Sequence, residues 1–240
     1  MPLPMLERAL QLRSRAFKAG LTLLAVFIAL VPFSERVFTI VSGPIIAQLP
    51  PEAQLIAKTV ASPFLTPLKA TMWVALFLSM PFLIYHLWRF VELWLEERGR
   101  RIALPFLLAS AVLFYAGVAF AWFLVLPMVF GFFTQTAPTG VTVMTDIAAY
   151  LEFTTAMLFA FGLAFQVPIA IVIIVWTGLV SRKTLAGSRP YVFLGAFVIG
   201  MVLTPPDIFS QTLLAVPMYA LFEAALFFCK RFLPEATEDG

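Results

Sequence analysis

The residues with the greatest chemical potential in this sequence are polar side chains inside long apolar runs. Glu223 and Gln166 each lie in such a run. A carboxylate there has to be protonated, paired or solvated, so Glu223 is expected either to form internal hydrogen bonds or to be a partner contact or proton site. Gln166 lies two residues before Pro168, and its amide is expected to face protein, water or a ligand.

The remaining reactive residues do not form a catalytic pattern. The sequence contains no G-x-S-x-G, H-E-x-x-H or Walker A motif, and its only histidine, His86, is expected at the edge of an apolar run rather than in a catalytic pair. Cys229 is the only cysteine, so no intrachain disulfide is possible and no Cys/His pair has metal-ligand spacing. We therefore expect no enzymatic activity, no metal and no cofactor.

The composition is that of an integral membrane protein. Hydrophobic residues make up 62% of the 240-residue chain and charged residues 12%, and the mean hydropathy is +0.97. A water-soluble domain cannot bury so much apolar surface. The net charge of +3 is too small to indicate nucleic-acid binding.

The apolar runs predict an all-α polytopic protein with six transmembrane helices. The expected spans are residues 19–38, 70–91, 102–133, 151–180, 191–203 and 209–228. The fifth is too short to cross a full bilayer at ~1.5 Å per residue. In the fourth, Pro168 leaves the Ala164 carbonyl without its helical donor, which predicts a kink.

The positive charges predict the orientation. Thirteen of the 16 Lys and Arg residues lie in the N-terminal segment, the second and fourth connections and the tail, and only Arg36, Lys58 and Lys69 lie on the other side. By the positive-inside rule, both termini are cytoplasmic. The chain is expected to be one membrane domain over residues 1–240, with cytoplasmic segments at 1–18 and 230–240.

Several long strings in this sequence resemble the TatC family. They are Val60-Ala-Ser-Pro-Phe-Leu-Thr-Pro-Leu-Lys69, Phe114-Tyr-Ala-Gly-Val-Ala-Phe120, Arg189-Pro-Tyr-Val and Leu203-Thr-Pro-Pro-Asp-Ile-Phe-Ser-Gln-Thr-Leu-Leu-Ala-Val-Pro-Met-Tyr219. The resemblance covers about residues 8–231. It implies a concave arrangement with short fifth and sixth spans, in the bacterial cytoplasmic (inner) membrane.

The resemblance also implies a function. TatC proteins are receptor subunits of the twin-arginine translocase, which exports folded proteins using the protonmotive force. Their partners are TatA-like and TatB-like single-span proteins, twin-arginine signal peptides and other TatC copies. The implied signal-peptide residues are Arg8, Gln11, Arg13, Phe90, Glu96, Glu97, Gly99, Arg100 and Gln166.

Three of these positions depart from the family pattern. Gln11 replaces the glutamate of the family's E-L-R, Gly99 stands where a glutamate is usual, and Gln166 where many members carry a glutamate. A neutral amide lacks the charge-assisted pairing that a carboxylate offers to guanidinium groups. Either Glu96 or Glu97 substitutes for the missing charge, or the two only balance nearby arginines and recognition is altered or weakened.

Other positions are implied to serve partners or an external cap. The resemblance assigns docking of single-span partners to Met201, Thr204 and Gln211, and Glu223 is grouped with them. The external cap contains Asp207 and Pro44, which is expected in the first external loop, where a rigid turn is the simpler reading.

Three alternatives remain open at this point. A divergent TatC paralogue would share the fold but handle few or unusual substrates. A proton-coupled secondary transporter would use Glu223, Gln166 and the broken helix to line a solute path. An intramembrane protease would need paired catalytic residues within spans, yet Asp146, Asp207 and Asp239 lie in expected loops or the tail.

Overall fold

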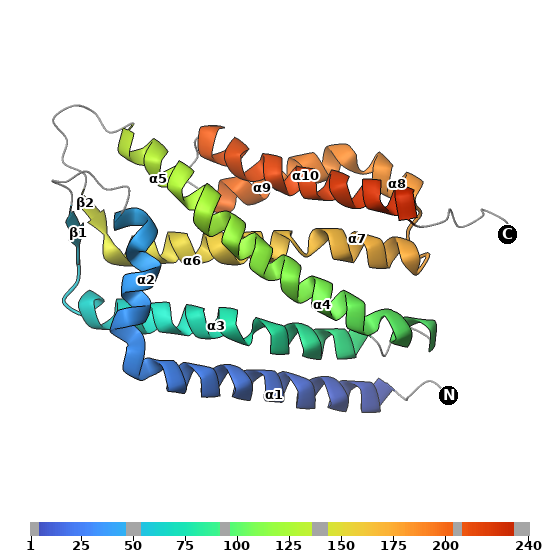
Figure 1. Ribbon diagram of the computed structural model, residues 1–240, viewed down its shortest axis with the longest axis horizontal. Helices are drawn as coiled ribbons and strands as arrows, with labels where there is room; N and C mark the ends of the chain where they lie inside the picture. The colour runs from blue at the N-terminus through green and yellow to red at the C-terminus, as the bar shows by residue number, and fades with distance from the viewer. Residues whose placement is uncertain (1–4, 47–53, 92–96, 136–143, 204–207, 233–240) are drawn as a thin grey trace. The chain divides into compact units, whose positions relative to one another are not determined.

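A computed structural model describes residues 5–46, 54–91, 97–135, 144–203 and 208–232, and almost all of them are helical (Figure 1). The described residues fall into two compact units. Unit 1 contains those within 1–46, 54–111 and 144–151, and unit 2 contains those within 112–143 and 152–240. Each unit is considered by itself below.

Unit 1 is built on three long helices. They are α1 (Met5–Leu30), α3 (Ser62–Val91) and the first part of α4 (Glu97–Phe120). A 3₁₀ turn at Val31–Phe33 joins α1 to α2 (Ser34–Ile46), and Pro32 lies in that turn. Both α1 and α2 pack on α3. The first apolar run is therefore helical well beyond the expected limits of residues 19–38.

The prediction that Pro44 lies in a loop is wrong, because it lies in the last turn of α2. This helix continues because its apolar face is buried: Val41 packs with Ala70 and Leu151, supported by Val37 and Phe38. Here the favourable burial of side chains outweighs the tendency of proline to end a helix.

A small sheet closes one end of unit 1. Strands β1 (Gln54–Ile56) and β2 (Met144–Asp146) pair in parallel, with Leu55 opposite Thr145. Lys58 Nζ lies 3.6 Å from Asp146 Oδ2, and Asp146 Oδ1 accepts a hydrogen bond from the Ala148 amide at the start of α6 (Ile147–Ala164). The all-α prediction missed this two-stranded element.

Unit 2 contains the rest of α4 and α6 together with five further helices. They are α5 (Leu126–Gln135), α7 (Val167–Trp176), α8 (Arg182–Gly187), α9 (Arg189–Leu203) and α10 (Ile208–Phe232). A π-helical segment, Ala121–Val125, links α4 to α5, and the Leu126 amide bonds the Ala121 carbonyl five residues back. Pro127 follows directly and lacks a donor for the regular helical ladder. Contacts within this unit join α10 to α7, α8 and α9.

Among the described residues, five helical runs are long and apolar enough to cross a membrane: Arg13–Gly43, Ser62–Arg89, Leu104–Phe133, Ile147–Trp176 and Gln211–Phe232. The last has 22 residues, fewer than the others. The predicted fifth span is a shorter apolar helix, Arg189–Val202. Helix α9 has 15 residues, which gives a length of about 22 Å against a hydrocarbon core of ~30 Å. The predicted shortness of this span is thus confirmed.

Two glycines allow α4 and α6 to cross closely in unit 2. A Cβ atom on Gly117 would overlap the Phe161 backbone carbonyl, and one on Gly162 would overlap the Phe114 ring. Phe120 fills the adjacent space, with its ring centroid 5.6 Å from that of Phe161. Small residues permit this approach where lipid provides no hydrophobic drive for association.

We predict that Gly117→Ala destabilises the protein by about 1–3 kcal/mol, because the added methyl meets backbone rather than a side chain that can move. Denaturant unfolding in detergent micelles measures the effect. The matched control is Gly195→Ala on α9, where an added Cβ has no neighbour within 4 Å. Equal stability of the two variants would contradict the close crossing.

Candidate functional site

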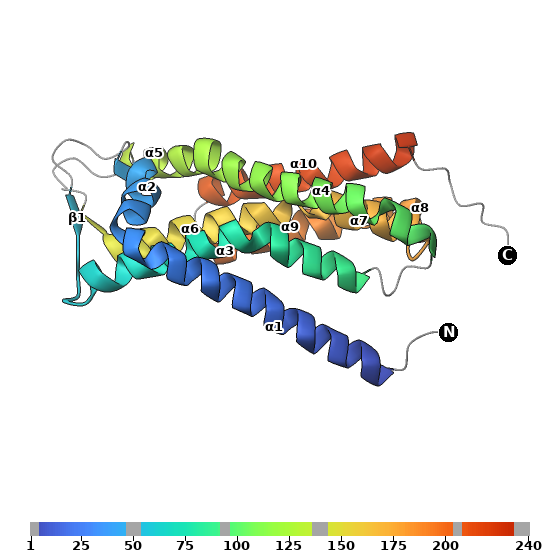
Figure 2. The same ribbon diagram turned by 60° about the horizontal axis from the view of Figure 1, so that its bottom comes forward.

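One end of unit 1 brings together elements that carry predicted binding residues. Figure 1 and Figure 2 place the start of α1, the end of α3 and the start of α4 at the same end. There, the Trp88 indole Nε1 donates a buried hydrogen bond of 3.0 Å to Ser110 Oγ, and the Trp88 ring lies 5.7 Å from that of Phe106. These contacts hold the end of α3, which precedes residues 92–96, against α4, which follows them.

The sequence-predicted residues of unit 1 belong to these three elements. Arg8, Gln11 and Arg13 lie on α1, Phe90 lies in the last turn of α3, and Glu97, Gly99 and Arg100 lie in the first turn of α4, whereas Glu96 is outside the described residues. Glu97 and Gly99, which lie between the expected spans 70–91 and 102–133, are already helical because α4 begins at Glu97. A glutamate at a helix N-terminus interacts favourably with the helix dipole, which favours this earlier start.

Arg15 is a further candidate at the start of the first apolar run, and sequence reasoning used it only to assign orientation. The side chain is half-buried, and its Nη1 atom is fully buried with no hydrogen-bond partner in the described part of the chain. A buried guanidinium nitrogen without an acceptor is costly. An anionic group supplied by a partner would relieve that cost.

Gln166 lies in unit 2 at a helix break. Helix α6 ends at Ala164 and α7 begins at Val167, so the interruption predicted from Pro168 is confirmed. The backbone N–H of Gln166 donates to the Leu163 carbonyl at 2.9 Å. This bond spans three residues, as in a 3₁₀ turn, instead of the four of an α-helix. The Gln166 side chain is half-buried and has an interaction partner. Its amide group therefore faces protein, as expected from the sequence.

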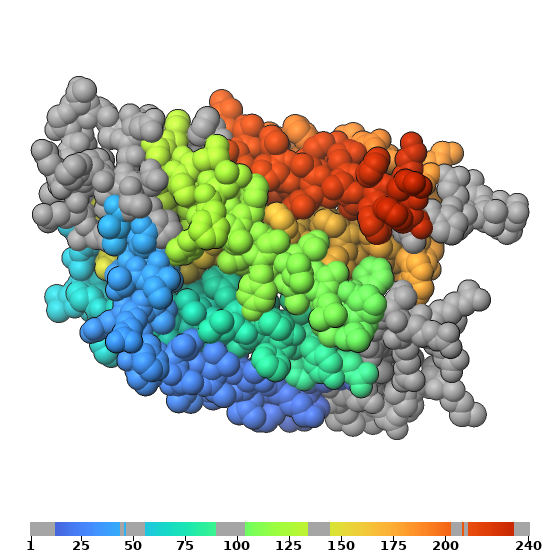
Figure 3. Space-filling model, viewed as in Figure 1, coloured from blue at the N-terminus to red at the C-terminus, as the bar shows by residue number. Residues whose placement is uncertain are grey.

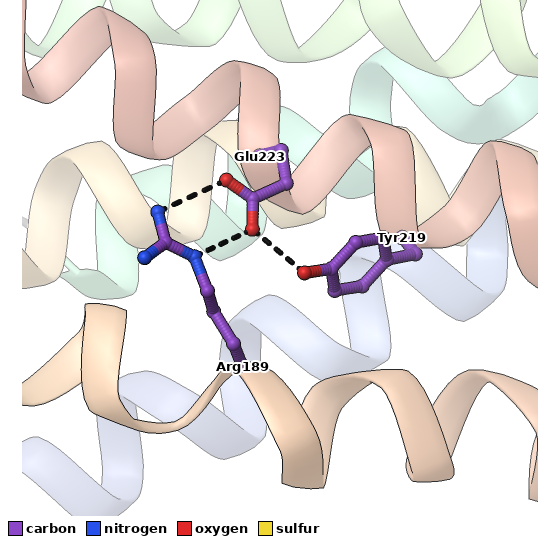
Figure 4. Close-up of polar contacts among 3 residues, drawn as sticks. All are labelled: Arg189, Tyr219 and Glu223. Atoms are coloured by element: carbon purple, nitrogen blue, oxygen red, sulfur yellow. Dashed lines mark hydrogen bonds and ion pairs between the residues drawn. The ribbon is translucent and has the colours of Figure 1, made fainter.

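A second polar cluster in unit 2 joins α9 to α10 (Figure 4). Arg189 at the start of α9 donates two hydrogen bonds to Glu223 on α10, at 2.7 Å from Nε and 3.1 Å from Nη2. The Tyr219 hydroxyl donates to the same carboxylate at 2.8 Å. The Phe193 ring also meets the Tyr219 ring edge-on at 5.4 Å. We call Arg189, Tyr219 and Glu223 the α9–α10 clamp.

Near the other end of α9, a second contact fixes the same two helices. Gln211 Nε2 donates to the Phe197 carbonyl at 2.9 Å, and Gly200 lies close to the Gln211 backbone. The Gln211 side-chain amide therefore has a hydrogen-bond acceptor on α9. Met201 has 53% of its surface exposed. Thr204 and Asp207 are outside the described residues.

Glu223 is thus a paired carboxylate, which is one of the three states expected from the sequence. Its partner Arg189 is 34 residues away in the chain, so no local pattern identified the pair. Among the described residues, no three His, Cys, Asp or Glu side chains are grouped to hold a metal ion. The cluster's chemistry is charge-assisted hydrogen bonding, which is stronger than neutral bonding.

Comparison with known proteins gives a consistent result. Residues 8–217 match the family model "Sec-independent protein translocase protein (TatC)". The chain is 46% identical over 99% of its length to the protein of that name from Haemophilus influenzae, covering 93% of the relative. It is 48% identical to that of Escherichia coli K12, with 96% of this chain and 89% of the relative covered.

Solved structures agree with the sequence comparisons. A crystal structure of the twin arginine translocase receptor TatC superposes with a TM-score of 0.83 at 31% identity, covering 93% of this chain and 98% of that one. A second, obtained in the detergent DDM, gives a TM-score of 0.84 at the same identity, covering 92% and 98%.

We predict that Glu223→Gln lowers the melting temperature in detergent, because the amide cannot accept both bonds from Arg189 as a carboxylate does. Arg189→Glu should lower it further by placing two carboxylates together. The reversed pair, Arg189→Glu with Glu223→Arg, should recover part of the loss. A reversed pair less stable than both single variants would contradict a direct interaction between these side chains.

Proposed function

This chain belongs to the TatC family of Sec-independent protein translocase proteins, and we propose that it is the receptor subunit of a twin-arginine translocase. In this role it binds twin-arginine signal peptides and exports folded proteins across the bacterial cytoplasmic membrane, driven by the protonmotive force. The observation that carries the proposal is the match to TatC proteins and receptor structures over almost the whole chain.

The proposed topology has six spans, with α9 as the fifth, in one membrane domain over residues 1–240. Residues 1–18 and 230–240 lie in the cytoplasm. The distribution of Lys and Arg supports this orientation. The short α9 fits it if the bilayer thins locally or if the turn that follows lies below the membrane surface.

The proposed signal-peptide site is the end of unit 1 that carries the predicted residues of α1, α3 and α4. Gln166 of unit 2 is proposed as a separate signal-peptide contact. Phe90 provides an apolar contact, and Glu97 accepts hydrogen bonds from the arginines of the signal. A carboxylate pairs with guanidinium in a two-pronged geometry that lysine cannot reproduce. Glu97 thereby replaces the charge missing at Gly99 and Gln11, and Glu96 contributes to the same negative field.

The proposed docking surface for TatA-like and TatB-like helices is the exposed apolar face of α9. Val198, Met201 and Val202 on this helix are 46%, 53% and 79% exposed. The α9–α10 clamp and the bond from Gln211 to Phe197 support the proposal, because they hold this short helix in place before a partner arrives. Glu223 contributes to docking by fixing α9. Thr204, which lies outside the described residues, is proposed as a further partner contact.

We predict that photocrosslinkers placed near Phe90 and Glu97, with both of these residues kept, capture a folded precursor carrying a twin-arginine signal and not one carrying twin lysine. The assay uses membrane vesicles with the cognate partner proteins. Glu97→Gln should weaken twin-arginine capture by about fivefold, the difference between a charge-assisted and a neutral hydrogen bond. Glu35→Gln, the same change on α2 of unit 1, is the control and should have no effect.

A converse variant tests the departures from the family pattern. Gly99→Glu should strengthen twin-arginine capture by a similar factor, because it restores a carboxylate at the position where the family usually carries a glutamate. Equal capture of arginine and lysine signals by the wild type would mean that recognition has diverged, as expected for a paralogue with other substrates.

A further inference from the structure

One end of unit 2 carries a group of four cations, three of them exposed and Arg182 half-buried. They come from α8, which lies between α7 and α9 and packs on both α9 and α10, and from the last turns of α10. The members are Arg182, Lys183, Lys230 and Arg231. Because α8 packs directly on α10, the two elements contribute to one surface. We call these four residues the α8–α10 basic surface.

Little negative charge opposes this surface. Within the described residues of unit 2, the only acidic side chains are Glu152 and Glu223. Glu152 lies near the start of α6, at the opposite end of the unit in Figure 1. Glu223 is engaged by Arg189 and Tyr219 in the α9–α10 clamp. Lys183, Lys230 and Arg231 are all exposed, so an anion from outside the described residues can reach these three charges.

Exposed apolar side chains lie beside the basic surface. Leu179 is 76% exposed, Phe232 65% and Phe228 46%. The rings of Phe228 and Phe232 stack at 4.7 Å, and the Arg231 guanidinium lies 5.9 Å above the Phe232 ring. Figure 3 shows the last part of α10, in red, uncovered on one face. A phospholipid has a charged headgroup and apolar acyl chains. The cations at the end of α10 match an anionic headgroup, and the exposed apolar side chains beside them match the acyl chains.

We propose that the α8–α10 basic surface binds the phosphate of an anionic phospholipid, with its acyl chains against Leu179, Phe228 and Phe232. Clustered Lys and Arg beside a membrane helix attract anionic headgroups. An acidic peptide would satisfy the cations but would leave the apolar side chains uncovered. This inference concerns a surface separate from the proposed signal-peptide site.

The test is native mass spectrometry of the full chain in detergent, titrated with phosphatidylglycerol or phosphatidylcholine. The wild type should bind phosphatidylglycerol preferentially. Each cation removed should weaken that binding about fivefold, so Lys183→Gln/Lys230→Gln/Arg231→Gln should weaken it about a hundredfold. The matched variant, Lys183→Arg/Lys230→Arg/Arg231→Lys, keeps every charge and should bind like the wild type.

Three results would count against the proposal. The first is equal binding of both lipids by the wild type, a measurement that needs no variant to fold. The second is an unchanged phosphatidylglycerol preference in the triple glutamine variant with native circular dichroism. A preference that inorganic phosphate removes at millimolar concentration would also count against a lipid, because it would show that the acyl chains contribute nothing.

Discussion

The absence of water from the hydrocarbon core of a bilayer forces each spanning segment to satisfy its own backbone N–H and C=O groups. The five long apolar runs are accordingly helical. Next to two prolines, the regular i→i−4 hydrogen bonds of the helix are replaced by others. The backbone N–H of Gln166 donates to the Leu163 carbonyl, and the backbone N–H of Leu126 donates to the Ala121 carbonyl. The Thr71 hydroxyl also donates to the Pro67 carbonyl one turn earlier on α3, at 2.8 Å. The short β1–β2 pair is instead confined to an end of unit 1.

The same constraint governs the polar side chains. Glu223 is stabilised in its apolar helix by Arg189 and Tyr219, Gln211 by the Phe197 carbonyl, and Trp88 by Ser110. These bonds have structural consequences beyond their own groups. Helix α9 is too short to hold its place by spanning alone, and its two polar contacts with α10 define its position. Its exposed apolar face is consequently presented in a fixed orientation.

The sequence predicts features that depend on local composition. Apolar runs define the long helices, Pro168 defines the break after Ala164, and the spacing from Arg189 to the Pro205-Pro206 pair defines the short α9. Features that depend on distant partners were not predicted. The Arg189–Glu223 pair joins residues 34 apart, and β1 pairs with a strand 90 residues later. The helical placement of Pro44 was missed because burial of Val41 against α3 is a tertiary effect.

The candidate recognition residues were found by family resemblance, and the charge pattern among them is what distinguishes this chain. Gln11, Gly99 and Gln166 remove negative charge, whereas Glu96 and Glu97 retain it nearby. We assign recognition of the twin-arginine signal to the remaining carboxylates, Glu96 and Glu97. The most direct test is export of a folded reporter in cells whose own TatC-family protein is replaced by this chain, with its cognate partners. Export of a twin-arginine reporter with a twin-lysine reporter retained in the cytoplasm is the predicted result. Export of neither, despite a correctly inserted protein, or of both equally, would contradict it.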